Sequence, residues 1–370
     1  MRVNAAVLHE TRTPFRIQSV ELSPPREGEV LVRMEAAGVC HSDWHVATGD
    51  SKMPLPVVAG HEGAGVVEAV GQGVTRVRKG QRVVLCWAPH CGTCYHCTHD
   101  RKCLCPAYTA NRWNGVLMDG SPRLALSNGT PVYHFCSIAC FADHAVVHES
   151  SCVPVDDELD PGVGALVGCA VTTGVGAVVR TAKVPAGATV AVFGVGGVGL
   201  CIVMAARIAG AAMIIAIDPE ESRLAMAEKF GATHTIKALR DGGAVNDEIK
   251  SLTGGLGADY AFEAVGLPAV QEQSLAAVRA GGTVVLAGLS PMGSSTNLPG
   301  AILTRREIMV MGSYYGTADP DRDFPLYIDW HRRGDLPIDQ LITARYPLTR
   351  INEAYDDMLN GRNTRGGIAR

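Results

Sequence analysis

The sequence predicts an α/β protein in which a doubly wound parallel sheet is joined to a second, mostly antiparallel β domain. The chain has 370 residues, enough for two hydrophobic cores. Residues 171–310 alternate apolar strand patterns with helical patterns, as successive βαβ units do. Residues 1–170 instead carry short Val-rich strands between Gly and Pro turns. Residues 311–370 return to a mixed, Pro-containing pattern, and we expect them to pack onto the first domain.

Each predicted element is bounded by residues that end strands or helices. In the first domain the typical strands are Val30–Met34, Gly65–Val70 and Arg82–Leu85, each flanked by Gly, Pro or charge. In the second domain strand and helix patterns alternate. The elements expected there are Thr189–Phe193, Gly197–Ala209, Met213–Ile217, Glu221–Phe230, Tyr260–Ala264, Ala269–Ala280 and Thr283–Ala287.

Composition excludes several classes of protein. Apolar residues make up 47% of the chain and charged residues 19%, with a formal net charge of −4, which is typical of a globular protein without a nucleic-acid partner. Met1–Glu10 lacks an apolar signal-peptide core, so we expect a cytoplasmic protein with no membrane partner. The apolar stretch Leu200–Ile217 is interrupted by Arg207, which favours a helix followed by a buried strand over a membrane span.

A Gly-rich turn predicts a dinucleotide site of the Rossmann type. Gly194, Gly196 and Gly199 follow the strand Thr189–Phe193 and fit the pattern G-x-G-x-x-G, which brings backbone and a helix N-terminus to a pyrophosphate. Asp218 ends the next strand at the distance expected of the acidic residue that binds the adenosine ribose. Since a carboxylate there repels a 2′-phosphate, the sequence favours NAD over NADP.

Four of the 12 cysteines fall within residues 91–105 and predict a structural metal site. Cys91, Cys94, Cys97 and Cys105 could close a tetrahedron of sulfur around zinc, leaving no open position. Without an export signal, a disulfide framework is disfavoured. On spacing alone, Cys103 could replace Cys105.

Three further residues supply the ligand set of a catalytic zinc. Cys40, His61 and Cys169 are weak signals when taken singly, because a lone Cys or His is usually structural. Together they provide two thiolates and an imidazole, which bind zinc and leave one position for water or substrate.

The chain resembles the zinc-containing medium-chain alcohol dehydrogenases over nearly its full length. The motifs that carry the resemblance are Cys-His-Ser-Asp at 40–43, Gly-His-Glu at 60–62, the four-cysteine lobe and the Gly-rich turn. The resemblance is to the branch that includes the liver-type and glutathione-dependent formaldehyde enzymes. It implies a GroES-like catalytic domain (1–170 and 311–370) and an NAD-binding Rossmann domain (171–310). It also implies two zinc ions per chain, a small-molecule alcohol or aldehyde substrate, and a homodimer or homotetramer.

The resemblance assigns roles around the catalytic zinc. Asp43 would orient His61 as a metal ligand, and Glu62 would lie just behind the metal. Ser42 would take the alcohol proton and pass it through the cofactor ribose to His45. The remaining assigned residues contact the cofactor (His41, Val198, Arg223 and Arg365) or line the substrate pocket (Trp87, Phe135 and Leu289).

Two departures from the family pattern narrow the expected function. His41 stands where liver-type enzymes often carry Arg, so we expect NADH to be held less firmly and to leave faster. The segment Thr48–Lys52 lacks the acidic insertion usual in the glutathione-dependent branch. We therefore expect oxidation of primary alcohols, aromatic or medium-chain, with a thiol–formaldehyde adduct as the alternative substrate. A zinc-free binding relative and a zinc-finger nucleic-acid binder are the rival classes, and the full ligand set and the acidic charge count against them.

Overall fold

The structure, a computed structural model, describes residues 1–239 and 244–369 and divides into two compact units. The first unit contains Met1–Cys169 and Asp319–Arg370, and the second contains Ala170–Ala318. The sequence placed the return to the first unit near residue 310. The return comes later because β16 (Met309–Gly312) pairs with β15 (Val278–Leu286) and so completes the sheet of the second unit.

The second unit contains the predicted doubly wound parallel sheet. Its strand order is β13-β12-β11-β14-β15-β16, and every neighbouring pair is parallel. The order reverses between β11 and β14, which is where such sheets bind ligands at the carboxyl ends of their strands. The bounds not given above are β11 Thr189–Phe193, β12 Met213–Asp218, β13 His234–Lys237 and β14 Ala258–Glu263.

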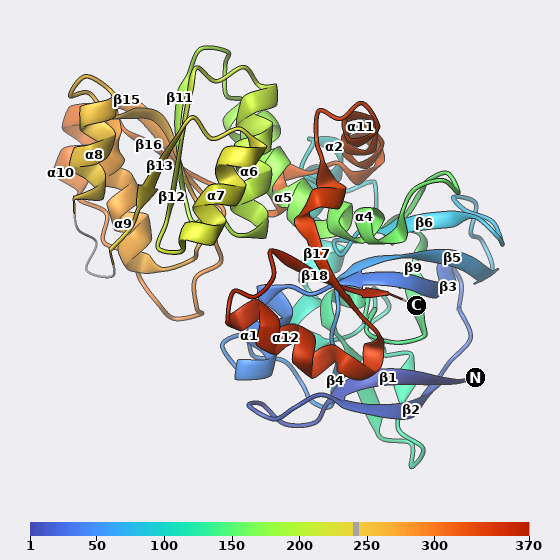
Figure 1. Ribbon diagram of the computed structural model, residues 1–370. Helices are drawn as coiled ribbons and strands as arrows, with labels where there is room; N and C mark the ends of the chain where they lie inside the picture. Colours follow the sequence, from blue (N-terminus) through green and yellow to red (C-terminus); the bar gives the residue numbers. More distant parts are fainter. Residues whose placement is uncertain (240–243, 370) are drawn as a thin grey trace. The chain divides into compact units, whose positions relative to one another are not determined.

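Helices cover both faces of this sheet. Figure 1 shows α6 and α7 on one side of the strands and α8, α9 and α10 on the other. The apolar stretch at 200–217 is the buried helix α6 followed by β12, as predicted. α9 ends three residues earlier than predicted, because the chain becomes extended at Val278 and enters β15. The helices of this unit are α5 Thr172–Gly176, α6 Gly197–Ile208, α7 Glu221–Phe230, α8 Val245–Leu252, α9 Pro268–Ala277 and α10 Gly300–Arg306.

The first unit is mostly antiparallel β structure, as predicted. A closed barrel has the strand order β1-β2-β7-β8-β4, and a second sheet has the order β10-β6-β5-β3-β18-β17, with β9 also paired to β3. The ten strands before the second unit are β1 Arg2–Leu8, β2 Arg16–Leu22, β3 Glu29–Gly38, β4 Val57–Val58, β5 Glu62–Val70, β6 Arg82–Leu85, β7 Leu124–Ala125, β8 Pro131–His134, β9 His144–His148 and β10 Cys152–Pro154.

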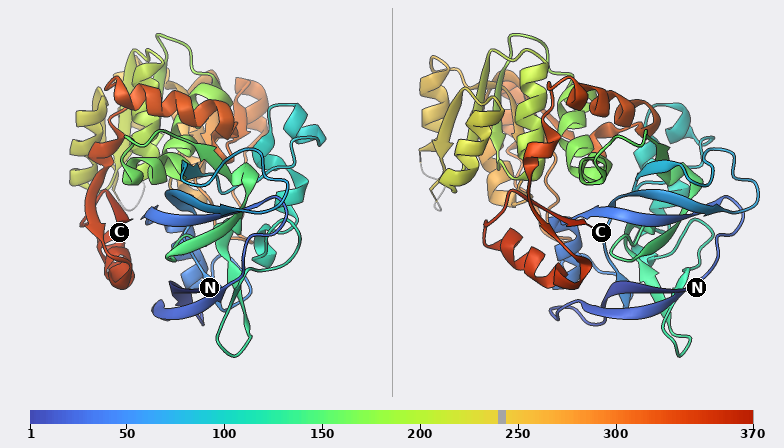
Figure 2. Two further views of the ribbon diagram at one scale, coloured as in Figure 1. Left: turned by 90° about the vertical axis from the view of Figure 1, so that its right-hand side faces the viewer. Right: turned by 45° about the vertical axis from the view of Figure 1, so that its right-hand side comes forward.

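Segments from the C-terminal part of the chain complete the first unit. β18 (Arg365–Ala369) pairs antiparallel with β3, and β17 (Ile342–Tyr346) pairs with β18. Figure 2 shows these red strands beside the blue strands from the start of the chain. The helices of the first unit are α1 His41–Thr48, α2 Tyr95–Thr98, α3 Pro106–Thr109, α4 Pro161–Leu166, α11 Pro320–Arg332 and α12 Ile351–Leu359.

One helical run, Pro161–Ala182, is long and apolar enough to cross a membrane when judged by length and composition alone. Its most apolar window is 89% buried inside the protein. A buried core helix has the same length and composition, so this run is weak support for a membrane span.

Candidate active site

The helix α1 carries four residues of the first predicted cluster in a fixed spatial order. Cys40 is extended and immediately precedes α1, and Gly49 ends the helix in a left-handed conformation. Asp43 is fully buried, whereas Ser42 and His45 are half-buried. Because Ser42 and His45 are three residues apart, they lie on the same side of the helix. The helix therefore directs one carboxylate inward and presents a hydroxyl and an imidazole at its surface.

Asp43 holds the segment before β5 and with it His61. One Asp43 oxygen accepts the backbone N–H of Gly60 at 2.7 Å and lies 3.1 Å from His61 Nδ1. An ionised carboxylate can only accept a hydrogen bond, so Nδ1 is the nitrogen that donates to Asp43, and Nε2 lies on the opposite side of the ring. His61 Nε2 lies 3.2 Å from Cys169 Sγ. This is the orientation that a metal-binding imidazole requires.

Cys169 is brought to the same place by an irregular turn of helix. It lies in a π-helical segment, Val167–Val171, directly after α4, and π turns are frequent at functional sites. The donor atoms of Cys40, His61, Glu62 and Cys169 all lie within 4.8 Å of one another, and all four residues are buried. Two thiols, an imidazole and a carboxylate form a donor set that suits zinc.

Burial and mutual contact perturb the protonation of this cluster. The hydrogen bond from the Cys169 thiol is the main reason that the pKa of Cys40 lies well below its usual range, and His61 adds to it. The same contact and burial raise the pKa of Cys169 well above its usual range. Burial alone would lower the pKa of His61, but the carboxylate of Asp43 and the Cys40 sulfur raise it instead. The two thiols of the cluster therefore differ in acidity, and Cys40 is the more acidic of the two.

Glu62 pairs with an arginine from the other end of the chain. Arg365 Nη2 donates to Glu62 Oε2, and both side chains are buried. Burial raises the pKa of Glu62 to about 7, against the opposing charge of Arg365. Gly38 on β3 leaves the space for this carboxylate, since a Cβ there would lie 1.9 Å from Glu62 Oε2. The sequence assigned Arg365 to the pyrophosphate and did not anticipate this ion pair.

Two of the three predicted pocket residues lie against the cluster. Phe135 and Trp87 contact the His61 ring edge-on, with ring centroids 5.4 Å and 6.3 Å away, and both are buried. They place an aromatic wall beside the proposed metal position. Leu289 belongs to the second unit, where it is 50% exposed.

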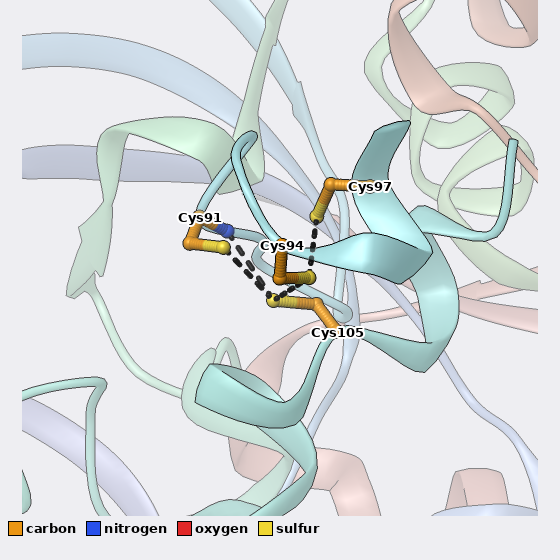
Figure 3. Close-up of side chains that lie close together, drawn as sticks. All are labelled: Cys91, Cys94, Cys97 and Cys105. Carbon is orange, nitrogen blue, oxygen red and sulfur yellow. Dashed lines mark hydrogen bonds between the residues drawn. The ribbon is translucent and has the colours of Figure 1, made fainter. Parts of the chain in front are cut away.

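The four-cysteine lobe forms a second cluster within the first unit (Figure 3). Cys94 Sγ lies 3.5 Å from Cys97 Sγ and 3.9 Å from Cys105 Sγ, and Cys105 Sγ lies 3.6 Å from Cys91 Sγ. All four sulfurs fall within 4.8 Å of one another, so Cys105 and not Cys103 belongs to the set. Four sulfurs around one point are the donor set of a closed zinc site.

The lobe exposes one sulfur and buries another. Backbone N–H groups of Thr93 and Cys94 bond the Cys91 sulfur and lower its pKa to about 6, whereas burial raises the pKa of Cys97 to about 12. The lobe is also tied to the N-terminus of α11. Lys102 Nζ lies 2.7 Å from Asp319 and 3.0 Å from Asp321. No sequence pattern indicated these ion pairs, because they join residues more than 200 positions apart.

In the second unit the Gly-rich turn has the predicted form. Gly194 has φ +84° and directly follows β11, and Gly199 lies in the first turn of α6. A Cβ on Gly199 would lie 1.9 Å from Gly194 O, so only glycine permits this close packing of strand and helix. Gly196 precedes α6 and Val198 lies in its first turn. The turn therefore presents backbone N–H groups at the carboxyl end of the central strand.

Asp218 ends β12 beside this turn. Its two oxygens accept the backbone N–H groups of Val195 and Glu220, each at 3.0 Å, and it is 2% exposed. Arg223 Nη1 lies 3.7 Å from it. Because an ionised carboxylate accepts about four hydrogen bonds, Asp218 keeps acceptor capacity for a ligand hydroxyl. His41, which was also predicted to contact the cofactor, is exposed at the start of α1 in the first unit.

Comparison with known proteins gives matches along the whole chain. A family model described as alcohol dehydrogenase GroES-like domain matches residues 26–157, and one described as zinc-binding dehydrogenase matches residues 197–333. Putative alcohol dehydrogenase D of Mycobacterium tuberculosis is 40% identical over 371 residues, covering 100% of both chains. The NDMA-dependent alcohol dehydrogenase of Amycolatopsis methanolica is also 40% identical, covering 100% of this chain and 99% of its own.

A third relative and two crystal structures extend the comparison. S-(hydroxymethyl)glutathione dehydrogenase of Paracoccus denitrificans is 36% identical, covering 100% of both chains. An alcohol dehydrogenase zinc-binding domain protein from Burkholderia ambifaria has a TM-score of 0.94 at 37% identity. Benzyl alcohol dehydrogenase from Acinetobacter calcoaceticus has a TM-score of 0.93 at 30% identity. Each structure covers 100% of this chain and 99% of its own.

Proposed function

We propose that this chain, which belongs to the zinc-binding alcohol dehydrogenase family, is an NAD-linked oxidoreductase that interconverts primary alcohols and their aldehydes. The observation that carries the proposal is the buried convergence of Cys40, His61 and Cys169 beside an aromatic wall. The benzyl alcohol dehydrogenase among the similar structures supports an aromatic alcohol as substrate, with medium-chain alcohols next.

Two zinc sites are proposed, one for each cluster. Cys40, His61 and Cys169 would hold the catalytic ion, with Glu62 within reach of it, and the four sulfurs of the lobe would hold the structural ion. A catalytic zinc supplies Lewis acidity, which lowers the pKa of an alcohol hydroxyl and polarises a carbonyl. The aromatic ring of a substrate would lie against Trp87 and Phe135, which exclude water from beside His61.

The proton leaves through residues of α1 in this proposal. Ser42 Oγ lies 3.8 Å from Cys40 Sγ and is half-buried, so it is positioned to accept the substrate hydroxyl proton. His45, one turn further along the helix, would pass that proton to solvent. Its Nδ1 lies 3.3 Å from Asp50 Oδ2, which fixes the ring and leaves Nε2 to exchange protons. Asp43 would keep His61 in the tautomer that binds metal.

NAD is the proposed cofactor. Gly194, Gly196, Val198 and Gly199 would approach the pyrophosphate, and Asp218 would accept the ribose hydroxyls and repel a 2′-phosphate. Further contacts are proposed for His41, Arg223 and Arg365. The ion pair with Glu62 occupies Nη2 of Arg365, so any pyrophosphate contact would use its other donors.

The alternative substrate, a thiol adduct of formaldehyde, is retained because of the 36% identical S-(hydroxymethyl)glutathione dehydrogenase. We also propose a cytoplasmic homodimer or homotetramer, which light scattering after size exclusion would distinguish. The domain limits proposed for catalysis are residues 1–170 and 311–370, with 171–310 for cofactor binding.

The test is a substrate and cofactor screen on the purified protein. Benzyl alcohol, hexanol and S-(hydroxymethyl)glutathione are each assayed with NAD and with NADP. We expect the highest kcat/KM with benzyl alcohol and NAD, and an Asp218→Gly variant should gain mainly with NADP. Highest turnover with the thiol adduct would establish the alternative, and a preference for NADP in the unaltered protein would refute the role of Asp218.

A further inference from the structure

A buried carboxylate lies at the carboxyl end of β14, in the second unit. Glu263 is the last residue of this strand and is fully buried. Its Oε1 accepts the backbone N–H groups of Val265 and Gly266, each at 2.7 Å. Hydrogen bonds that a carboxylate accepts are among the stronger ones in proteins. The turn formed by residues 264–267 is therefore anchored to this one side chain.

The same residue also holds the segment that follows β15. The backbone oxygen of Glu263 accepts the N–H groups of Ala287 and Gly288, at 2.8 Å and 2.9 Å. A Cβ on Gly288 would lie 2.8 Å from Glu263 Oε2 and 2.2 Å from Gly266 N, so only glycine permits this close approach. Glu263 thus joins the turn after β14 to the segment after β15, residues 287–289.

The turn that Glu263 anchors lies against the Gly-rich turn. A Cβ on Gly194 would lie 2.4 Å from Val265 Cγ2, so the valine side chain packs directly on this glycine. Val265 is nevertheless 44% exposed, and Leu289, in the segment after β15, is 50% exposed. Two apolar side chains therefore reach the surface at the carboxyl edge of the sheet, on the segments that Glu263 joins.

The strand order indicates which half of the cofactor would lie over these segments. β11 has β12 on one side and β14 on the other. A doubly wound sheet of this kind is built from two mononucleotide-binding halves, which meet where the strand order reverses. If Asp218, at the end of β12, binds the adenosine ribose as proposed, the nicotinamide half lies over the carboxyl ends of β14 and β15.

We infer that Glu263 is a positioning residue for the nicotinamide half of the cofactor, and that it acts through Val265 and Leu289. The inference rests on the proposed function, because it concerns the NAD site of that proposal. Segments that are fixed before the cofactor arrives do not have to be ordered on binding, and this raises affinity without any contact between the cofactor and the anchoring group.

The experiment measures binding of NADH and of ADP by titration calorimetry in the unaltered holoenzyme and in two variants, Glu263→Gln and Glu263→Ala. ADP carries the adenosine and the pyrophosphate but lacks the nicotinamide half. We expect Glu263→Gln to weaken NADH by about tenfold and to leave ADP within about twofold, because an amide oxygen accepts weaker hydrogen bonds than a carboxylate does. Glu263→Ala removes the acceptor altogether and should weaken NADH further.

Asp259→Asn is the matched control. Asp259 lies near the amino end of the same strand, and its carboxylate accepts a backbone N–H group, that of Thr189, at 2.7 Å. This variant should lower the melting temperature without a selective loss of NADH. If Glu263→Gln only lowers the melting temperature in the same way, or weakens NADH and ADP equally, its role is structural and the inference is wrong.

A double-mutant cycle tests the path through Val265. In a Val265→Ala background, Glu263→Gln should weaken NADH by a smaller factor than in the unaltered protein, because residues that act through one another are not additive. Equal factors in the two backgrounds would overturn the inference while leaving the NAD-linked function in place. Failure of the unaltered protein to bind NADH at all would refute the proposed function itself, and the inference with it.

Discussion

The two cysteine clusters of this protein are built in opposite ways. The lobe takes all four sulfurs from 15 consecutive residues, 91–105, and one of them is exposed. The other cluster takes its donors from the residue before α1, from the residues at the start of β5 and from a π turn, and every donor residue is buried. The local cluster needs only its own loop to be folded, whereas the dispersed cluster exists only when the whole first unit is folded. The contrast predicts that the lobe contributes mainly to the stability of the folded protein and the dispersed cluster mainly to catalysis.

The largest expected effect follows from removing one sulfur from the dispersed cluster. Cys169→Ser should lower kcat/KM by about a thousandfold or more, because Lewis acidity contributes several kcal/mol to the barrier and each 1.36 kcal/mol is tenfold in rate. The melting temperature should change little. Steady-state kinetics and calorimetry measure both, with the buried Cys152→Ser as the control. If Cys169→Ser were unfolded at room temperature and showed no separate loss of kcat/KM, the contrast between the two clusters would be wrong.

The converse change is Cys97→Ser in the lobe. We expect the melting temperature to fall by about 10 °C or more, while kcat per folded molecule stays within a fewfold, because a structural zinc contributes to folding directly. Cys103→Ser is the matched control, since Cys103 is a buried cysteine of the same loop outside the set. A loss of turnover equal to that of Cys169→Ser would show that both clusters serve chemistry.

Metal content sharpens the contrast further. Elemental analysis should give two zinc ions per chain, one in Cys97→Ser, and one in Cys169→Ser. A chelator should remove the lobe ion first, because Cys91 is exposed and the dispersed cluster is buried. Time courses of zinc release and of activity should therefore separate, with stability lost before activity. One ion per unaltered chain would contradict the two-site assignment.

Asp43 tests whether the dispersed cluster depends on its orientation. Asp43→Asn should weaken zinc binding and kcat/KM by about ten- to hundredfold, because an amide holds His61 less firmly than a carboxylate. Asp50→Asn, which alters the carboxylate beside the half-exposed His45, is the control for zinc affinity. Equal zinc affinity in the two variants would mean that His61 is oriented by the metal alone.

The smallest expected effect is on acid stability and involves neither cluster. His134 is buried, and burial together with Arg123 lowers its pKa to about 3. The unfolded chain binds a proton near pH 6.5, so between pH 6.5 and 3 it binds more protons than the folded chain, and stability falls as the pH falls. The loss is about 2 kcal/mol at pH 5 relative to neutral pH. Chemical denaturation at both values should show it, and His134→Gln should flatten the difference.

The sequence predicts the local parts of this molecule better than the dispersed ones. The spacing of the lobe cysteines and the Gly-rich turn each fix their own geometry within a few residues, and both have the predicted form. The convergence of Cys40, His61 and Cys169 could be predicted from residue types, because Cys and His at a family's positions leave few other roles. The residues that hold this cluster in place could not be predicted. Neither the ion pair of Arg365 with Glu62 nor the stacking of Arg112 on Trp87 leaves a pattern, since packing alone decides them.

The pairing of β18 with β3 sets an order of events during synthesis. Arg365 and its strand leave the ribosome after the whole of the second unit, about 200 residues later than Cys169. At about 5–20 residues per second this takes roughly 10–40 s. During that time the end of β3 has β5 on one side but lacks its partner β18 on the other, and the carboxylate of Glu62 lacks its guanidinium. The second unit is continuous in sequence and can fold while the first unit is still incomplete. The part of the chain that is translated first is therefore the last to complete its fold.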